Sequence, residues 1–203
     1  MAAEETKKNY SEESLSFEKN TMLYLHDLIY LLAIVMVVFV LLFRIVIVSG
    51  SSMYATLWDG DWLLVAGSLF TDELEYGDIV VASKNSFNSG EPIIKRVIAT
   101  EGQTVDIDFD AGIVYVDGVA LDEDYIYTPT NVDEGIVFPI TIADGCIFAM
   151  GDNRNGSLDS RNPLIGMIDE REILGKALFL LFPGTGDDSN RADRDFKRIG
   201  VIN

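Results

Sequence analysis

The sequence predicts a mainly β domain that follows a single N-terminal transmembrane helix. One observation is a run of 16 uncharged, largely apolar residues at positions 28–43. Another is a series of short β-prone runs between residues 62 and 182, separated by turns rich in glycine and aspartate. The mean hydropathy is +0.20 although 24% of the residues are charged. Apolar residues must therefore be concentrated in one segment, and residues 28–43 provide it.

The apolar run is long enough to be a membrane anchor. At about 1.5 Å per residue, residues 28–43 extend roughly 24 Å, and continuing to residue 48 gives roughly 31 Å if Arg44 reaches the headgroups. The alternative is a cleaved secretory signal, but Val48-Ser49-Gly50 matches a small-x-small cleavage site poorly. We expect a tail at residues 1–26, a transmembrane helix at 27–48 and a C-terminal domain at 49–203.

Basic residues predict the orientation of this anchor. Lys7, Lys8 and Lys19 precede the apolar run, whereas Arg44 is the one basic residue at its far end before Lys84. Because positive charges stay on the cytoplasmic side, the tail is expected in the cytoplasm and the C-terminal domain outside it. The protein would then be a single-pass protein of the cell membrane.

Seven segments of the C-terminal region are predicted to be strands, on β propensity, alternation and flanking turns. They are residues 62–65, 79–82, 93–98, 104–109, 113–116, 146–150 and 174–182. Asp110-Ala111-Gly112 lies between two alternating runs, which is typical of a hairpin turn.

Charge and rare residues exclude several classes of function. The chain has 15 basic and 33 acidic residues and a formal charge of −18, so nucleic acid would be repelled. One cysteine, Cys146, excludes an intrachain disulfide and a multi-cysteine metal site. One histidine, His26, leaves few histidine-based schemes. We expect neither a metal nor a cofactor.

Ser52 lies in the segment Gly-Ser-Ser-Met-Tyr-Ala-Thr-Leu, residues 50–57, soon after the apolar run. A serine acts as a nucleophile only if a base removes its proton. His26 lies at the opposite end of the apolar run, a membrane thickness away, so the base would have to be another residue. Considered alone, the segment is also compatible with a loop or a helix cap.

Lys95 lies in the run Ile-Ile-Lys-Arg-Val-Ile, residues 93–98. Side chains alternate along a strand, so Lys95 shares a face with Ile93 and Val97. Desolvation lowers the pKa of a lysine and can make it a usable base. The alternative is an exposed lysine on an edge strand, which deters aggregation.

Residues 151–161, Gly-Asp-Asn-Arg-Asn-Gly-Ser-Leu-Asp-Ser-Arg, form a dense polar loop after a predicted buried strand. Arginine–carboxylate pairs and side-chain bonds to the backbone can fix such a loop in one conformation. The alternative is a solvated turn whose surface ion pairs contribute little.

Four sequence blocks together resemble bacterial type I signal peptidases, in the compact Gram-positive form. They are residues 50–57, Gly-Asp-Ile-Val at 77–80, Lys-Arg-Val-Ile at 95–98, and residues 151–161, in the order of that family. Ala55 replaces the usual proline of the first block, and Gly50 stands where some members carry a second hydroxyl.

The resemblance implies roles for individual residues. Ser52 corresponds to the nucleophile and Lys95 to the general base. The Ser157 hydroxyl would orient Lys95, with Asp159 helping to hold that arrangement, and the Ser52 N–H would be an oxyanion donor. The other supporting residues of the loop would be Asp152, Arg154 and Arg161.

The implied activity is the removal of signal peptides from exported preproteins by a membrane-anchored serine endopeptidase, without metal or cofactor. Its partners would be signal peptides and the lipid bilayer. Shallow pockets for small side chains would be lined by Val46, Val48, Met53, Leu57 and Ile94. Alternatives are a pilus-dedicated enzyme or a non-catalytic, signal-peptidase-like assembly factor, although the intact serine and lysine argue against an inactive protein. A self-cleaving repressor of related fold is disfavoured by the apolar run and the acidity.

Overall fold

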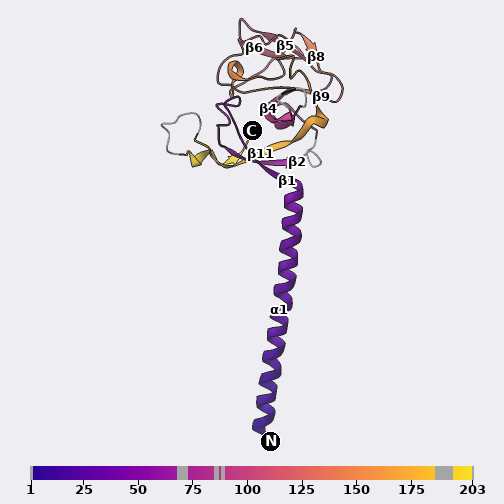
Figure 1. Cartoon of the computed structure of the whole chain (residues 1–203), viewed down its shortest axis with the longest axis vertical. Helices are drawn as coiled ribbons and strands as arrows, with labels where there is room; N and C mark the ends of the chain where they lie inside the picture. The colour runs from indigo at the N-terminus through magenta and orange to yellow at the C-terminus, as the bar shows by residue number, and fades with distance from the viewer. Residues whose placement is uncertain (1, 68–72, 85–86, 88–89, 186–193, 203) are drawn as a thin grey trace. The chain divides into compact units, whose positions relative to one another are not determined.

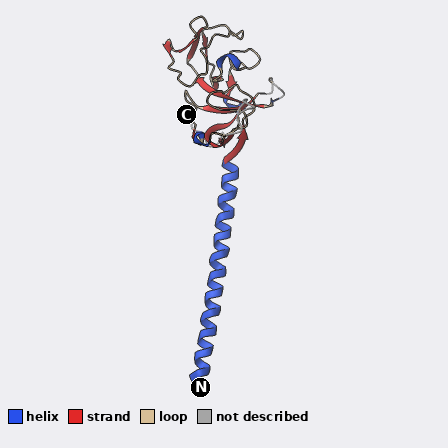
Figure 2. Ribbon diagram, turned by 90° about the vertical axis from the view of Figure 1, so that its left-hand side faces the viewer, coloured by secondary structure: helices blue, strands red, loops and turns tan. Residues whose placement is uncertain are grey.

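The chain consists of two compact units, Met1–Leu42 and Phe43–Asn203. The structure is a computed structural model. It describes residues 2–67, 73–84, 87, 90–185 and 194–202, and for residues 2–18 only the backbone. The second unit consists of strands and loops with short helical turns (Figure 2). The predicted class, a mainly β domain after an N-terminal helix, is confirmed.

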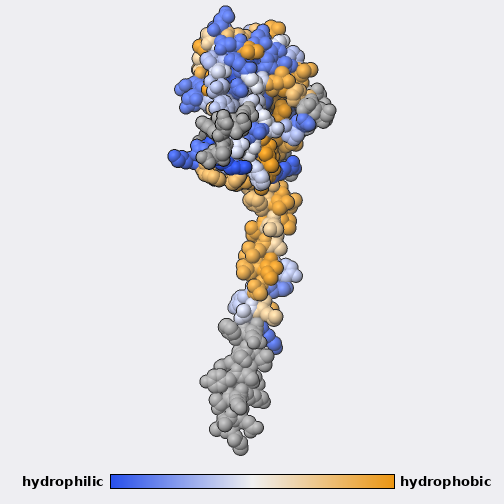
Figure 3. Space-filling view, turned by 60° about the vertical axis from the view of Figure 1, so that its left-hand side comes forward, coloured by the Kyte–Doolittle hydropathy of each residue, from blue (hydrophilic) through white to orange (hydrophobic). Residues whose placement is uncertain are grey.

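The first unit is a single helix, α1 (Ala2–Leu42). Among the described residues, its Lys19–Leu42 part is the one helical segment long and apolar enough to cross a membrane. Its 24 residues extend about 36 Å at 1.5 Å per residue. Large apolar side chains such as Val35, Met36 and Leu41 are exposed along it (Figure 3). These properties suit a membrane anchor.

The predicted C-terminal limit of the helix, residue 48, is wrong. The helix ends at Leu42, and β1 (Phe43–Ile47) pairs antiparallel with β2 (Trp62–Gly67). Residues 45–48 of the predicted extension are all isoleucine or valine, β-branched residues that favour a strand where a partner is available. Hydropathy alone could not separate a longer membrane helix from a strand, because apolar side chains are kept away from water in both. The first strand of the second unit was therefore counted as helix.

An eight-stranded sheet has the order β1-β2-β11-β3-β4-β9-β10, with β12 also paired to β11. Its further strands are β3 (Ile79–Ser83), β4 (Pro92–Ala99), β9 (Cys146–Met150), β10 (Ile168–Asp169), β11 (Ile173–Phe182) and β12 (Gly200–Val201). The pairs along this order are antiparallel. The central position of β4, between β3 and β9, places its side chains in the interior.

A four-stranded sheet has the order β7-β6-β5-β8. Its strands are β5 (Thr104–Asp108), β6 (Ile113–Val116), β7 (Val119–Ala120) and β8 (Ile140–Thr141). Labelled strands of this sheet lie at the opposite end of the unit from β1, β2 and β11 (Figure 1). The predicted hairpin joins β5 to β6. Gly112 is required there, because its φ is +73° and a Cβ would lie 2.5 Å from Cβ of Pro129.

All seven predicted strands are present with ends shifted by at most two residues. The short strands β7, β8, β10 and β12 were not predicted, because two residues give no periodic pattern. Three groups of buried apolar residues fill the interior. One contains Val48, Met53 and Leu57 and packs under the segment that carries Ser52.

Candidate active site

Ser52 and Lys95 meet at the centre of the site. The Nζ atom of Lys95 donates a hydrogen bond to Oγ of Ser52 at 2.9 Å. Lys95 lies in the middle of β4 and is only 4% exposed. The two residues are 43 positions apart in the sequence, so the fold and not local structure brings them together. A neutral amine at this distance can accept the proton of the serine hydroxyl.

Burial lowers the pKa of Lys95 from 10.5 to about 8. Desolvation is the main cause, because it disfavours the ammonium form. The carboxylates of Asp159, Glu134 and Asp152 oppose this shift, whereas Arg161 reinforces it. About a tenth of Lys95 is therefore neutral at pH 7, far more than for an ordinary lysine, and this is the form that a general base requires.

The turn that carries Ser52 is fixed from both ends. Met53 and Leu57 are each 1% exposed, and the Leu57 N–H donates to the Met53 carbonyl at 2.8 Å. From the 151–161 loop, the Asn153 N–H donates to the Ser52 carbonyl at 3.0 Å, and its Nδ2 donates to the Ser51 carbonyl at 3.2 Å. The Ser52 hydroxyl thus projects from a backbone with little freedom to move.

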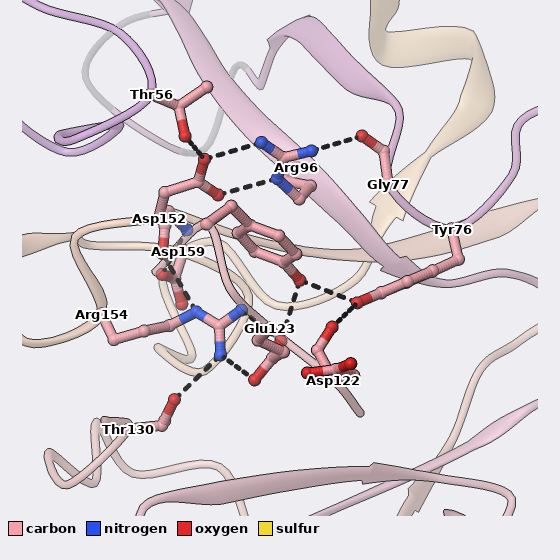
Figure 4. A network of polar contacts seen from close by, with 12 residues as sticks. Thr56, Tyr76, Gly77, Arg96, Asp122, Glu123, Thr130, Asp152, Arg154 and Asp159 are labelled. Atoms are coloured by element: carbon pink, nitrogen blue, oxygen red, sulfur yellow. Dashed lines mark hydrogen bonds and ion pairs between the residues drawn. The ribbon is translucent and has the colours of Figure 1, made fainter. Parts of the chain in front are cut away.

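Asp152 connects three segments of the site (Figure 4). Its carboxylate accepts two hydrogen bonds from Arg96, from Nε and from Nη2, both at 2.9 Å. It also accepts one from the Thr56 hydroxyl at 2.5 Å. Arg96 and Asp152 are both nearly inaccessible to solvent. The strand of Lys95, the turn of Ser52 and the 151–161 loop are therefore joined through one carboxylate.

Arg154 holds the other side of the loop (Figure 4). Its guanidinium donates to both carboxylate oxygens of Glu123, at 2.9 and 2.5 Å, and to the Thr130 hydroxyl at 2.9 Å. Its Nε donates to the Gly151 carbonyl at 3.2 Å. Tyr125 packs its ring against Arg96, with the guanidinium carbon 4.1 Å from the ring centre. Arg154 is fully buried, so the loop is not a solvated turn.

Asp159 and Arg161 form a second buried pair in the loop. The Asp159 carboxylate accepts from Nε and Nη2 of Arg161, both at 2.9 Å, and from the Gly151 N–H at 2.9 Å. The Arg161 Nη2 also donates to the Arg154 carbonyl at 2.5 Å. Asp159 therefore fixes the start of the loop, at Gly151, beside the Ser52 turn.

Ser157 lies against this junction. Its Oγ is buried and has no hydrogen-bond partner among the described residues. A Cβ at position 151 would collide with this oxygen and with the Ser52 carbonyl oxygen, so Gly151 is required by close approach. Ser157 is thus at the dyad, but its expected bond to Lys95 is not formed here, and its orienting role stays a prediction.

A cavity of about 420 Å³ opens beside the dyad. Ser52 and Lys95 line it, together with Val46, Val48, Met53 and Ile94 of the predicted pocket. Leu57, the fifth residue predicted for the pocket, lies in the core under the Ser52 turn and does not line this cavity. The remaining lining residues are Ile47 at the end of β1, Ser49, Glu91, and Pro92 and Ile93 at the start of β4. Such a groove suits an extended chain with small side chains.

Residues 122–135 contribute groups that sequence reasoning missed. Glu123 pairs with Arg154, and the ring of Tyr125 packs against Arg96. Oε1 of Glu134 lies 3.1 Å from Nη2 of Arg161. These residues lie between β7 and β8 without a periodic pattern or motif, so no local signal marked them. Within the described residues, no group of three or more His, Cys, Asp or Glu could hold a metal ion.

Known proteins resemble this chain over most of its length. The family described as "Signal peptidase, peptidase S26" matches residues 22–182. Signal peptidase I of Bacillus amyloliquefaciens is 35% identical over 188 residues, which cover 88% of this chain and 95% of that protein. Signal peptidase I T of Bacillus subtilis is 38% identical over 150 residues, covering 70% and 75% respectively. A crystal structure of a signal peptidase I from Enterococcus faecalis aligns with 27% identity and a TM-score of 0.42, covering 52% of this chain and 97% of that one.

Proposed function

The chain belongs to the signal peptidase family, peptidase S26, and on that premise we propose that it removes signal peptides from exported preproteins through a Ser52–Lys95 dyad. The observation that carries the proposal is the 2.9 Å contact between a buried lysine and the serine hydroxyl. A lysine whose pKa is lowered to about 8 can act as a base near neutral pH. The family membership supplies the substrate class.

The chemistry is an acyl transfer in two halves. Neutral Lys95 takes the proton from Oγ of Ser52 as Oγ attacks the scissile carbonyl carbon. The peptide C–N bond breaks, and the Lys95 ammonium gives its proton to the departing amine of the mature protein. Water then attacks the acyl carbon while Lys95 takes a proton from it. The bond between that carbon and Oγ of Ser52 breaks, the Lys95 ammonium returns the proton to Oγ, and the signal peptide leaves with a new carboxyl group.

The backbone N–H of Ser52 is the proposed oxyanion donor. No hydrogen bond from this N–H is found among the described residues, so it is available to the developing negative charge. Gly50, at the position where some family members carry a second hydroxyl, offers no side-chain donor. Its own N–H donates to Asp59 at 2.8 Å.

The groove explains a preference for small side chains. An extended substrate segment lying beside Val46, Val48 and Ile94 would bring its carbonyl to Ser52. Bulky side chains before the scissile bond would contact the core residue Met53, which is 1% exposed and cannot move without opening a cavity. Ala-x-Ala-like sites are the expected substrates.

The apolar part of α1 is the proposed single membrane span. The lysines of the tail, at positions 7, 8 and 19, orient the chain with residues 1–26 in the cytoplasm and the catalytic domain outside. Ser52 follows the end of the helix by only ten residues (52 − 42). At about 3.3 Å per residue, this link is at most roughly 33 Å long.

A non-catalytic assembly factor would have no use for the buried lysine–serine contact.

The test is cleavage of a preprotein by the full-length protein in detergent. Ser52→Ala and Lys95→Ala should each lose activity about a thousandfold or more, because one removes the nucleophile and the other the base. The matched controls are Ser51→Ala, next to the nucleophile, and Lys176→Ala, a lysine of β11 paired with Asp78 at the surface. Both controls should keep most of the activity. An inactive wild type, or a fully active Ser52→Ala or Lys95→Ala, would refute the proposal.

A further inference from the structure

The dyad lies among buried charges of both signs. With Lys95 included, four cations and four carboxylates gather here, and each side chain is 10% exposed or less. The cations are Lys95, Arg96, Arg154 and Arg161, and the carboxylates are Glu123, Glu134, Asp152 and Asp159. At such low exposure, each charge needs a partner of opposite sign nearby.

Three of the carboxylates are each matched to one arginine by two hydrogen bonds. Asp152 pairs with Arg96, Glu123 with Arg154 and Asp159 with Arg161, at 2.5–2.9 Å. Bidentate pairs of this kind are the strongest that a guanidinium makes. Two charges of the set remain after these pairs are formed, the cation of Lys95 and the anion of Glu134.

Glu134 has no arginine to itself. Its Oε1 lies 3.1 Å from Nη2 of Arg161, which already serves Asp159, and its Oε2 is buried without a hydrogen-bond partner among the described residues. Its segment is pinned to the loop, because the Ile136 N–H donates to the Arg161 carbonyl at 3.1 Å and Arg161 donates to the Val132 carbonyl at 3.2 Å. Glu134 is thus held in place with one carboxylate oxygen unpaired, and it shares with Asp159 the one arginine that faces its charge.

A short chain of contacts leads from Glu134 to the dyad. Arg161 bridges Glu134 and Asp159, and Asp159 accepts from the Gly151 N–H. Gly151 in turn lies against the Ser52 carbonyl. Since Ser52 receives the hydrogen bond of Lys95, an unbroken series of contacts joins the carboxylate to the amine.

We propose that Glu134 is the counter-charge of Lys95, a positioning residue that stabilises the protonated lysine and so sets the pH below which the dyad is inactive. The inference deepens the proposed function and rests on it. The groups that act on Lys95 are Asp159, Glu134 and Asp152, which favour its charged form, and Arg161, which disfavours it. Asp152 has Arg96 to itself and Asp159 takes both bidentate bonds of Arg161, whereas Glu134 makes a single contact with that same Arg161.

The charge balance has a consequence for activity. With Lys95 protonated, the four cations and four carboxylates sum to zero. The active dyad needs neutral Lys95, which leaves the cluster with one excess negative charge. Burial and the charge of Asp159 raise the pKa of Glu134, as expected of a carboxylate with an unsatisfied oxygen. Removing the Glu134 charge should therefore make the neutral, active form of Lys95 easier to reach.

The test compares Glu134→Gln with Asp133→Asn in the full-length protein, using kcat/KM against pH on a preprotein in detergent. Asp133 is the exposed neighbour, and its substitution changes the net charge equally. The acid limb of Glu134→Gln should move to lower pH by about half a unit or more, a gain of about threefold on the acid side. Asp133→Asn should leave the limb where it is.

Each outcome decides between explanations. An unmoved limb in Glu134→Gln, a shift to higher pH, or an equal shift in Asp133→Asn would overturn the inference while the proposed function stands. A uniform loss at every pH would assign Glu134 a purely structural role at Arg161. If Glu134→Gln does not fold, Glu134→Met must show the acid shift, and failure of both to fold would also overturn it. Failure of the wild type to cleave would instead refute the proposed function.

Discussion

The two faces of β4 each bury one cation, and they use it in opposite ways. Lys95 and Arg96 are neighbours on the strand, 4% and 2% exposed. Arg96 is surrounded by acceptors, with two hydrogen bonds to Asp152, one to the Gly77 carbonyl at 2.8 Å and the ring of Tyr125 on its face. Lys95 has one hydrogen bond within the described residues, to the neutral hydroxyl of Ser52.

The difference shows that burial alone does not make a base. Both side chains are shielded from water. For Arg96, the bidentate carboxylate of Asp152 replaces the hydrogen bonds that water would make, and a guanidinium does not give up its proton in a protein. Among the described residues no carboxylate pairs directly with the Lys95 ammonium. The nearby carboxylates offset only part of the desolvation, so the pKa of Lys95 falls to about 8. One face of β4 therefore holds the site together, while the other carries the proposed general base.

Exchanging the two cations one at a time should have the largest effect. Lys95→Arg should reduce kcat/KM by about a thousandfold or more at every pH, because arginine stays protonated and cannot take the Ser52 proton. The matched variant Arg96→Lys should keep activity within about tenfold while lowering stability, because lysine cannot bond both oxygens of Asp152. Preprotein cleavage across the pH range measures both. Equal losses in the two variants would abolish the distinction between the faces.

Breaking the Arg96 face should cost stability. Asp152→Asn removes the charge that compensates Arg96 and should lower the free energy of unfolding by about 3–5 kcal/mol. For a domain of this size the melting temperature should fall by about 10 °C. Thermal unfolding of the full-length protein in detergent measures it.

The control for this variant is Asp124→Asn, an exposed residue of the same acidic chain. It should stay within about 0.5 kcal/mol of the wild type. If the melting temperature of Asp152→Asn equals that of the wild type, the Arg96 face does not hold the site together.

Sequence patterns predicted the elements that have a period. Alternation and β-branched residues placed seven of the eight longer strands, all but β1, and these include β4 with Lys95 in its interior. The alternative of an exposed edge lysine is excluded by the position of β4 between β3 and β9. The end of the helix was misplaced because the hydropathy of residues 43–48 fits a helix and a strand equally well. The pairing with β2, which decides for a strand, is a contact between distant parts of the sequence.

The residues of the site could be predicted where they belong to one of the four sequence blocks, and could not where they lie outside them. Ser52, Lys95, Asp152, Arg154, Ser157, Asp159 and Arg161 all came from the four blocks, and all lie together. Glu123, Tyr125 and Glu134 belong to a segment without a pattern, and their role depends on which arginine each one meets. The protonation of Lys95 likewise depends on contacts across the fold, since the lysine and its opposing charges come from different segments.

The smallest expected effect is on stability and tests the Lys95 face without any substrate. The unfolded chain holds the Lys95 proton up to a pKa of 10.5, whereas the folded chain releases it at about 8. Between these values the unfolded state binds more protons, so the free energy of unfolding rises with pH in this window. Below about pH 8 the buried ammonium costs the fold about 3 kcal/mol.

Lys95→Met removes this cost at every pH, because a thioether carries no proton. The variant should be more stable than the wild type by about 3 kcal/mol at pH 7, and the excess should shrink between pH 8 and 10.5. Other titrating groups cancel in the difference. Denaturant unfolding in detergent can follow it through Trp58 and Trp62, the two tryptophans of the chain, both in the β domain. A difference that stays constant across this window would mean that Lys95 keeps an ordinary pKa, and the two faces of β4 would then hold their cations alike.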